Sequence, residues 1–113
     1  MFYDLTMLRN LSNNDEKFIV DMLNTFKRTN PPLLERMKKY ADEGKYEAAG
    51  REAHKMIPGV SFIGAKELQE VLVTIEESSK NSNEYQKIPD LVLSAIEKTN
   101  ELITSFENEY KLE

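Results

Sequence analysis

Residues 46–68 read YEAAGREAHKMIPGVSFIGAKEL, a stretch that carries the repeat of an amphipathic helix. Its apolar residues recur at alternating spacings of three and four, which on a helix gather into one stripe facing neighbouring helices. The stripe consists of Tyr46, Ala49, Ala53, Met56, Val60 and Ile63. This spacing predicts a helix from about Tyr46 to Phe62, followed by a turn at Gly64.

His54 lies inside this stretch and is the only histidine in the chain. At about 100° per residue, its side chain lies roughly 130° from the middle of the apolar stripe, so we expect the imidazole to face water. Most surface histidines have no function, but this one is flanked at helical spacing by Gly50, Pro58 and Ser61. Within a helix, glycine costs about 1 kcal/mol relative to alanine and proline about 3 kcal/mol. Such a bare surface suits docking by another protein. The alternatives are that Gly50 permits a close helix crossing and that Pro58 bends the helix around the core.

The remainder of the chain also predicts helices, and alternating strand patterns are absent. The first long helix should bury Phe18, Ile19, Met22, Leu23 and Phe26. We expect a chain break at Asn30-Pro31-Pro32 and a loop at residues 81–83. The expected elements are a lead-in or short helical turn over Phe2–Leu11, and helices from the capping residues 12–15 to about Arg28, from Pro31 to Asp42, from Ala65 to Ser79 and from Ile88 to Tyr110.

Short connections make helices that follow each other in sequence antiparallel. The predicted fold is therefore all-α, an antiparallel up-down four-helix bundle with an additional N-terminal helix. We expect a single domain over residues 1–113, with residues 1–30 forming the N-terminal lead-in and helix and residues 31–110 forming the four-helix bundle.

Composition narrows the functional classes. The 113 residues contain no cysteine, which excludes disulfides and thiolate metal sites, and a single histidine makes a zinc site a poor expectation. A net charge of −5 argues against nucleic-acid binding. No apolar run approaches the roughly 20 residues that span a bilayer, and no signal peptide opens the chain. We expect a cytoplasmic monomer without membrane contact and without a cofactor in this domain.

Three segments together resemble the histidine-containing phosphotransfer (HPt) domain of bacterial phosphorelays. These are Ala53-His54-Lys55-Met56, then Gly64-Ala65-Lys66-Glu67-Leu68, and then Ile75-Glu76. That family has Ala-His-x-Leu followed by a Gly-Ala-x-x-Leu segment ten residues after the histidine, and Gly64 is ten residues after His54. Residues 4–26 are similar to the family's lead-in and first helix, so the resemblance covers nearly the whole chain.

The resemblance implies that His54 accepts a phosphoryl group from an aspartate of one receiver domain and passes it to an aspartate of another. The partners would be response-regulator receiver domains, and a divalent metal would belong to the partner receiver. The domain would be a phosphocarrier with no independent kinase activity. Whether it stands alone or forms part of a hybrid sensor histidine kinase stays open.

The chain departs from the family beside the histidine. HPt domains commonly carry lysine three residues after the histidine and glycine at the fourth, where this chain has Ile57 and Pro58. The missing lysine would have helped to neutralise the phosphoryl group. Arg51 and Lys55 are the candidates to replace it, and Ser61 could donate a hydrogen bond. The docking surface candidates are Gly50, Ile57 and Pro58.

Two other interpretations compete with a phosphorelay carrier. The dimerisation helix of a histidine kinase resembles His-Glu-x-x-x-Pro, but here Lys55 follows the histidine and the proline comes one position earlier. The other is a non-catalytic helical adaptor, a protein-interaction bundle in which His54 is incidental.

Overall fold

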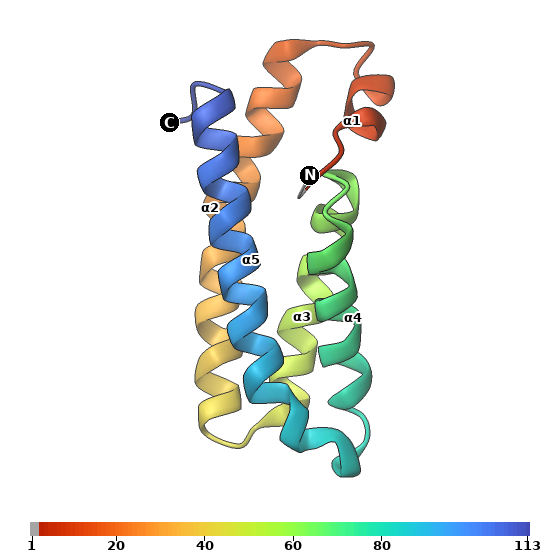
Figure 1. The fold of residues 1–113 in the computed structure, drawn as a ribbon, viewed down its shortest axis with the longest axis vertical. Coiled ribbons are helices and arrows are strands. Elements are labelled where there is room, and N and C mark those ends of the chain that lie inside the picture. Colours follow the sequence, from red (N-terminus) through yellow and green to blue (C-terminus); the bar gives the residue numbers. More distant parts are fainter. Residues whose placement is uncertain (1–2) are drawn as a thin grey trace.

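The computed structural model describes residues 3–113 and consists of helices joined by short connections (Figure 1). Helices α2, α3, α4 and α5 alternate in direction, and each packs against the next, with α5 returning to α2. No strand occurs in residues 3–113, so the predicted all-α four-helix bundle with an additional N-terminal helix is confirmed. The elements are α1 (Thr6–Leu11), α2 (Glu16–Asp42), α3 (Tyr46–Phe62), α4 (Lys66–Ser78), the 3₁₀ helix η1 (Ser82–Lys87) and α5 (Ile88–Glu109).

Helix α2 runs without a break through Pro31 and Pro32, so the predicted division at these prolines is wrong. The first helix of the bundle begins at Glu16, well before the predicted start of the bundle at residue 31. The predicted loop at residues 81–83 is also wrong in part. Its residues Ser82 and Asn83 open the 3₁₀ helix η1, which Asn81 caps by accepting a hydrogen bond from the backbone N–H of Asn83 at 3.1 Å.

Packing on both sides of the prolines explains why α2 continues. Phe26 and Asn30 before them, and Leu34 and Met37 after them, are buried on the same face, so a break would remove one half from the core. The side-chain amide of Asn30 also donates to the Phe26 carbonyl at 3.1 Å. The two carbonyls that the prolines leave without a helical donor belong to residues 27 and 28, which are half-buried and exposed, so water can reach them.

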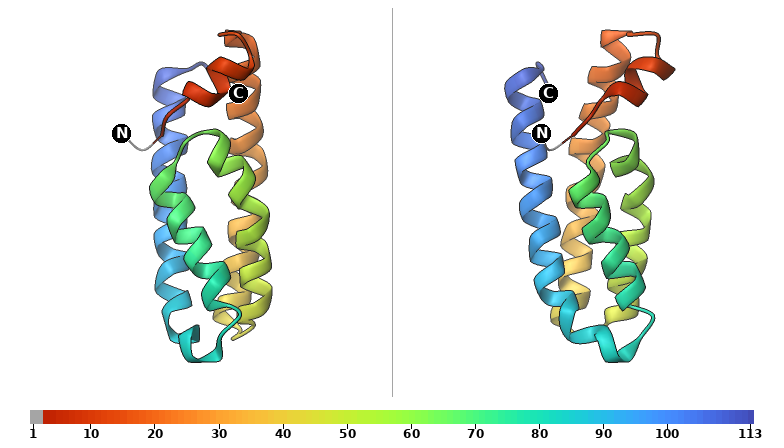
Figure 2. Two further views of the ribbon diagram at one scale, coloured as in Figure 1. Left: turned by 90° about the vertical axis from the view of Figure 1, so that its right-hand side faces the viewer. Right: turned by 45° about the vertical axis from the view of Figure 1, so that its right-hand side comes forward.

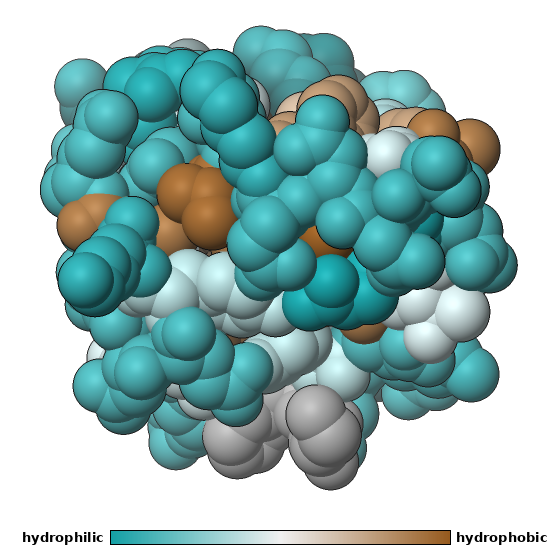
Figure 3. Space-filling view, turned by 90° about the horizontal axis from the view of Figure 1, so that it is seen from above, coloured by the Kyte–Doolittle hydropathy of each residue, from teal (hydrophilic) through white to brown (hydrophobic). Residues whose placement is uncertain are grey.

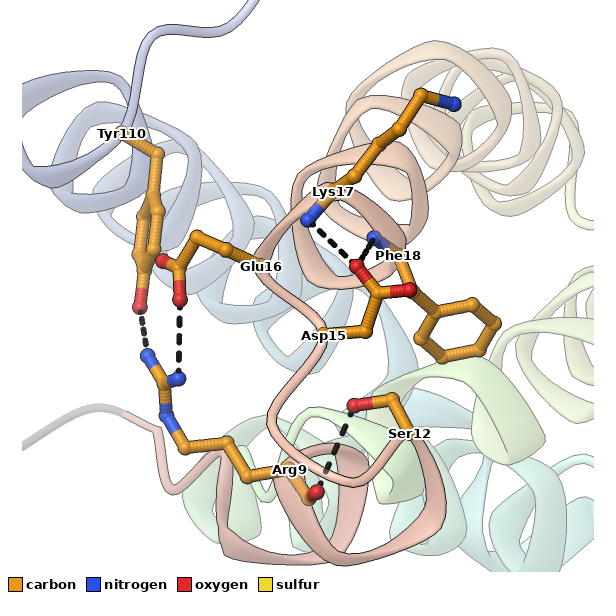
Figure 4. Close-up of polar contacts among 7 residues, drawn as sticks. All are labelled: Arg9, Ser12, Asp15, Glu16, Lys17, Phe18 and Tyr110. Carbon is orange, nitrogen blue, oxygen red and sulfur yellow. Dashed lines mark hydrogen bonds and ion pairs between the residues drawn. The ribbon is translucent and has the colours of Figure 1, made fainter.

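The short helix α1 covers one end of the bundle, above the turn between α3 and α4 (Figures 1 and 2). Arg9 of α1 binds Glu16 at 3.2 Å and donates a hydrogen bond to the Tyr110 hydroxyl at 2.9 Å (Figure 4). Asp15 caps α2 by accepting from the backbone N–H groups of Lys17 and Phe18 (Figure 4). These contacts fix α1 between the start of α2 and the end of α5.

Phe18 was predicted to be buried, but 41% of it is exposed. It lies in the first turn of α2, and this end of α2 extends past the ends of the shorter α3 and α4 (Figure 1). Seen end-on from this side, the mostly polar surface is interrupted by hydrophobic patches (Figure 3). The predicted lead-in began at Phe2, which lies outside the described residues; within them, the lead-in becomes α1.

The segment before α1 is tied to the turn between α3 and α4. The backbone N–H of Asp4 donates to the Ile63 carbonyl at 3.1 Å. Gly64 adopts a φ of +64°, and a Cβ at this position would lie 2.2 Å from the Asp4 carbonyl oxygen. Both the backbone conformation and the close approach therefore require glycine here.

A buried carboxylate links α3 to α2. The Glu52 side chain is only 4% exposed, and it binds Arg36 Nε at 2.5 Å and Lys55 Nζ at 2.8 Å. Burial alone would raise the pKa of Glu52, but the hydrogen bonds from Lys55 and Arg36 outweigh it and hold the pKa below its usual value. Lys55, the neighbour of His54 in sequence, is therefore held in an ion pair with the buried Glu52 carboxylate.

None of the helices in the described part of the chain combines the length and apolar character needed to cross a membrane.

Replacing Pro32 by alanine should stabilise the protein. The change restores a backbone donor to the Arg28 carbonyl and removes the proline ring from the helix interior, and together these should stabilise the folded state by about 3 kcal/mol. The unfolded chain gains conformational entropy without the proline, which lowers the stability by up to about 1 kcal/mol. We expect a net gain of about 2 kcal/mol in the free energy of unfolding, measured by urea denaturation. Pro89→Ala is the matched control, because Pro89 lies in the first turn of α5 and should give no such gain. A loss of stability in Pro32→Ala would contradict this account.

The Glu52→Gln variant should lose about 1–3 kcal/mol of stability at pH 7, because Arg36 and Lys55 lose their charged acceptor. A carboxyl whose pKa is lowered by folding stabilises the protein above its unfolded pKa, and this contribution disappears as the pH falls through the folded pKa. The difference between wild type and variant should therefore shrink below about pH 4. Urea denaturation across this pH range measures it. The exposed Glu77→Gln should show neither effect, and a difference for Glu52→Gln that persists at low pH would rule out the ionic explanation.

Candidate functional site

The His54 side chain projects from α3 and is 69% exposed, as the helical periodicity predicted. Its Nδ1 lies 2.8 Å from Glu76 Oε2 on the neighbouring helix α4. An ionised carboxylate can only accept, so Nδ1 carries the proton in this hydrogen bond. In the neutral ring the other nitrogen, Nε2, then has a free lone pair that points away from Glu76.

A hollow of about 420 Å³ lies beside the imidazole, between α3 and the end of α4. It brings three cationic side chains and two carboxylates around one histidine. Its lining residues are Glu47, Gly50, Arg51, His54, Lys55, Glu76, Ser79 and Lys80. A larger hollow of about 760 Å³ beneath α1 is not lined by the histidine, so its size does not mark the reactive site.

Close contact between α3 and α4 forms the floor of this site. Gly50 and Ser79 are both buried, and a Cβ at Gly50 would lie 2.0 Å from Ser79 Oγ and 2.4 Å from Ser79 Cβ. Only glycine fits unless α4 moves away. Glu76 is one turn before Ser79 on α4, and His54 is one turn after Gly50 on α3, so this contact sets the distance between the carboxylate and the imidazole.

The structure brings two of the three predicted phosphate neighbours to the hollow. Arg51 and Lys55 line it together with His54. Lys55 is also bound to the buried Glu52 at 2.8 Å. Ser61 does not line the hollow and is half-buried almost two turns further along α3, towards the turn at Gly64.

The three predicted docking residues have different surroundings. Pro58 is exposed on α3, one turn from His54. Ile57 is half-buried and packs against the core. Gly50 is buried against Ser79, so it is not free surface, and the alternative of a close helix crossing explains it.

Sequence reasoning missed the contribution of α4. Glu76 belongs to a sequence motif without a predicted role, and no role is predicted for Ser79 or Lys80. The signal available was the turn at Gly64, because two antiparallel helices joined there place residues at similar distances from the turn side by side. That geometry brings residues near Ile75 and Glu76 opposite His54.

The groups in this hollow suit transfer of an anionic group to nitrogen more than metal binding. Within residues 3–113, no group of three histidine, aspartate or glutamate side chains is arranged to hold a metal ion. The hollow instead offers an imidazole whose Nδ1 is held by a carboxylate and whose Nε2 has a free lone pair, with ammonium and guanidinium groups around the ring.

Comparison with known proteins assigns the chain to a family. No curated protein and no solved structure matched it. The family described as "Hpt domain" matches residues 21–107, which span most of the chain, including α3, α4 and nearly all of α2 and α5. Domains of this kind interact with receiver domains. The chain therefore belongs to the Hpt domain family, whose members carry out histidine phosphotransfer in phosphorelays.

Proposed function

We propose that His54 is the phosphoacceptor of this Hpt domain and that it relays a phosphoryl group between aspartates of two receiver domains. The observation that carries the proposal is the exposed imidazole whose Nδ1 is held by Glu76 at 2.8 Å, because this leaves Nε2 as a free and accessible nucleophile. The chain has no other histidine that could take this role.

In the proposed step, the Nε2 lone pair attacks the phosphorus of an aspartyl phosphate on the first receiver. The N–P bond forms as the P–O bond to the aspartate breaks, and the electron pair of that bond stays on the aspartate carboxylate. Nδ1 keeps its proton, so the phosphorylated ring is positively charged beside the Glu76 carboxylate. Transfer to the second receiver is the reverse reaction with a new aspartate.

Glu76 has two functions in this proposal. It fixes the ring orientation and the tautomer before attack, and it stabilises the positive ring that forms afterwards. Because Glu76 is only 22% exposed, its interaction with the ring is less screened by water than that of a surface ion pair. A ring that stays positively charged is also a better phosphoryl donor to the second receiver.

The receiver would approach the face of α3 that carries His54. Pro58, one turn from His54, is exposed there and presents little bulk beside the imidazole. This helix would hold the nucleophile on a rigid support, while the divalent metal and the acidic pocket belong to the receiver. In this proposal the domain has no cofactor of its own, binds neither nucleic acid nor membrane, and acts as a cytoplasmic monomer.

His54→Gln should fold like the wild type, since the side chain is exposed, but should take no phosphoryl label. The assay incubates each protein with candidate receivers phosphorylated by acetyl phosphate and Mg²⁺. Wild type should acquire phosphate that is labile in acid and stable in base, as expected for a phosphoramidate. Equal labelling of His54→Gln would refute the assignment. If the domain were a helical adaptor, wild type and His54→Gln would both bind receivers, and neither would acquire phosphate.

Two variants separate the charge of Glu76 from its hydrogen bond. Glu76→Gln keeps an acceptor for Nδ1–H but loses the charge, whereas Glu76→Ala loses both. Loss of one hydrogen bond of about 1.4 kcal/mol corresponds to about tenfold in rate. We therefore expect Glu76→Ala to slow transfer from a phosphorylated receiver at least about tenfold, and Glu76→Gln to slow it less. Wild-type rates in Glu76→Ala would show that the carboxylate does not position the ring.

A further inference from the structure

The phosphoryl group that His54 would carry lacks the cation that the family commonly provides three residues after the histidine. That position is Ile57, which is half-buried and packs against the core, so no charge can reach the imidazole from there. We propose that Lys80, at the end of α4, neutralises the phosphoryl group on His54. This inference rests on the proposed function and names a residue in the turn that follows α4, not on the helix of the histidine.

Lys80 and His54 share one acceptor. Glu76 Oε2 accepts from His54 Nδ1 at 2.8 Å and lies 3.6 Å from Lys80 Nζ. The longer distance exceeds that of a hydrogen bond, so the ammonium is attracted by the carboxylate without being fixed to it. The Lys80 side chain is 72% exposed and flexible, which allows its ammonium to move from Glu76 towards a new anion on the ring.

The other lysine beside the imidazole is less available. Lys55 binds Glu52, and moving Lys55 towards a phosphoryl group would leave this buried carboxylate with Arg36 alone. Removing one partner from a buried charge is unfavourable, so Lys55 should stay where it is. No corresponding buried charge holds Lys80.

Charge balance in the hollow also favours Lys80. Glu47 and Glu76 line the same space and repel an incoming phosphoryl group. Lys80 offsets Glu76 before phosphorylation and can then pair with the phosphoryl group itself. Arg51 makes no ion pair within residues 3–113 and lines the same hollow, so it is the alternative whose effect the experiment must separate.

The contact between Gly50 and Ser79 places Lys80 at the site. Ser79 directly precedes Lys80 and packs where a side chain at position 50 would otherwise lie. The end of α4 therefore approaches α3 closely enough for Lys80 to line the hollow that also contains the imidazole. On a helix pair with normal spacing, the same lysine would lie further from the histidine.

The test uses phosphoramidate, a small donor that phosphorylates imidazole without any receiver. The N–P bond to Nε2 forms as the P–N bond of the donor breaks and ammonia leaves. The variants are Lys80→Gln, Arg51→Gln and Lys55→Gln. Lys38→Gln is the matched control, because Lys38 also forms a pair with a carboxylate four residues away but lies on α2 outside the hollow. All four variants lose one positive charge, so effects of net charge cancel.

Two measurements decide the outcome. The rate of phosphohistidine formation, followed by ³¹P NMR, should fall about three- to tenfold in Lys80→Gln and stay near the wild-type value in Lys38→Gln. In the wild type, phosphorylation should shift the ¹³Cε resonance of Lys80 more than that of Lys55 or Lys38. A purely structural lysine would not show this shift.

The proposal is overturned if Lys80→Gln reacts like Lys38→Gln, or if the loss occurs in Arg51→Gln or Lys55→Gln alone while the Lys80 resonance is unchanged. If the wild type forms phosphohistidine under these conditions, an unchanged rate in Lys80→Gln counts against the role of Lys80 and not against the proposed function. Absence of any phosphohistidine in the wild type, with phosphoramidate and with phosphorylated receivers, would reject the proposed function and this inference with it.

Discussion

The distance between α3 and α4 is the constraint on which the site depends. Gly50 has no side chain, Ser79 fills the space, and the two helices meet at this point. The hydrogen bond between His54 and Glu76 lies one turn away along both helices. Any residue larger than glycine at position 50 would separate the helices at the place where an imidazole on one must meet a carboxylate on the other. The cost of glycine in a helix is thus offset by a contact between two helices.

The charges around the imidazole form two separate systems. On the inner side, Glu52 is buried and holds Arg36 and Lys55, which joins α2 to α3. On the outer side, Glu76 contacts His54 and Lys80, which joins α3 to the end of α4. Lys55 and His54 are adjacent in sequence but belong to different systems, because successive residues on a helix point in directions about 100° apart. The inner system stabilises the bundle, and the outer one is free to respond to a ligand.

Helix periodicity was sufficient to predict most of the fold. The ends of α3 agree with the prediction at Tyr46 and Phe62, since the apolar stripe and Gly64 are both local signals. The predicted break at Pro31 is wrong because tertiary packing outweighs the low helix preference of proline. This packing buries residues of α2 on both sides of the prolines. Phe18 was placed in the core for a related reason: periodicity shows which face is apolar, but it does not show where the neighbouring helices end.

The site itself was only half predictable. The exposure of His54 follows from its angle to the apolar stripe on a single helix. The identity of its partner depends on the register between two helices, which a single helix pattern does not contain. Arg51 and Lys55 were found because they are close in sequence, whereas Glu76 and Lys80 are close only in space. The buried position of Glu52 was equally hidden, because its partner Arg36 comes from α2.

The hydrogen bond from His54 to Glu76 also has a regiochemical consequence. An imidazole can be phosphorylated on either nitrogen, and the two products are distinct positional isomers. With the nitrogen nearer the main chain occupied by a carboxylate, only the remote nitrogen is open to an electrophile. Phosphohistidine in this chain would therefore be the tele isomer alone, and an antibody or reagent specific for the other isomer would find nothing to recognise.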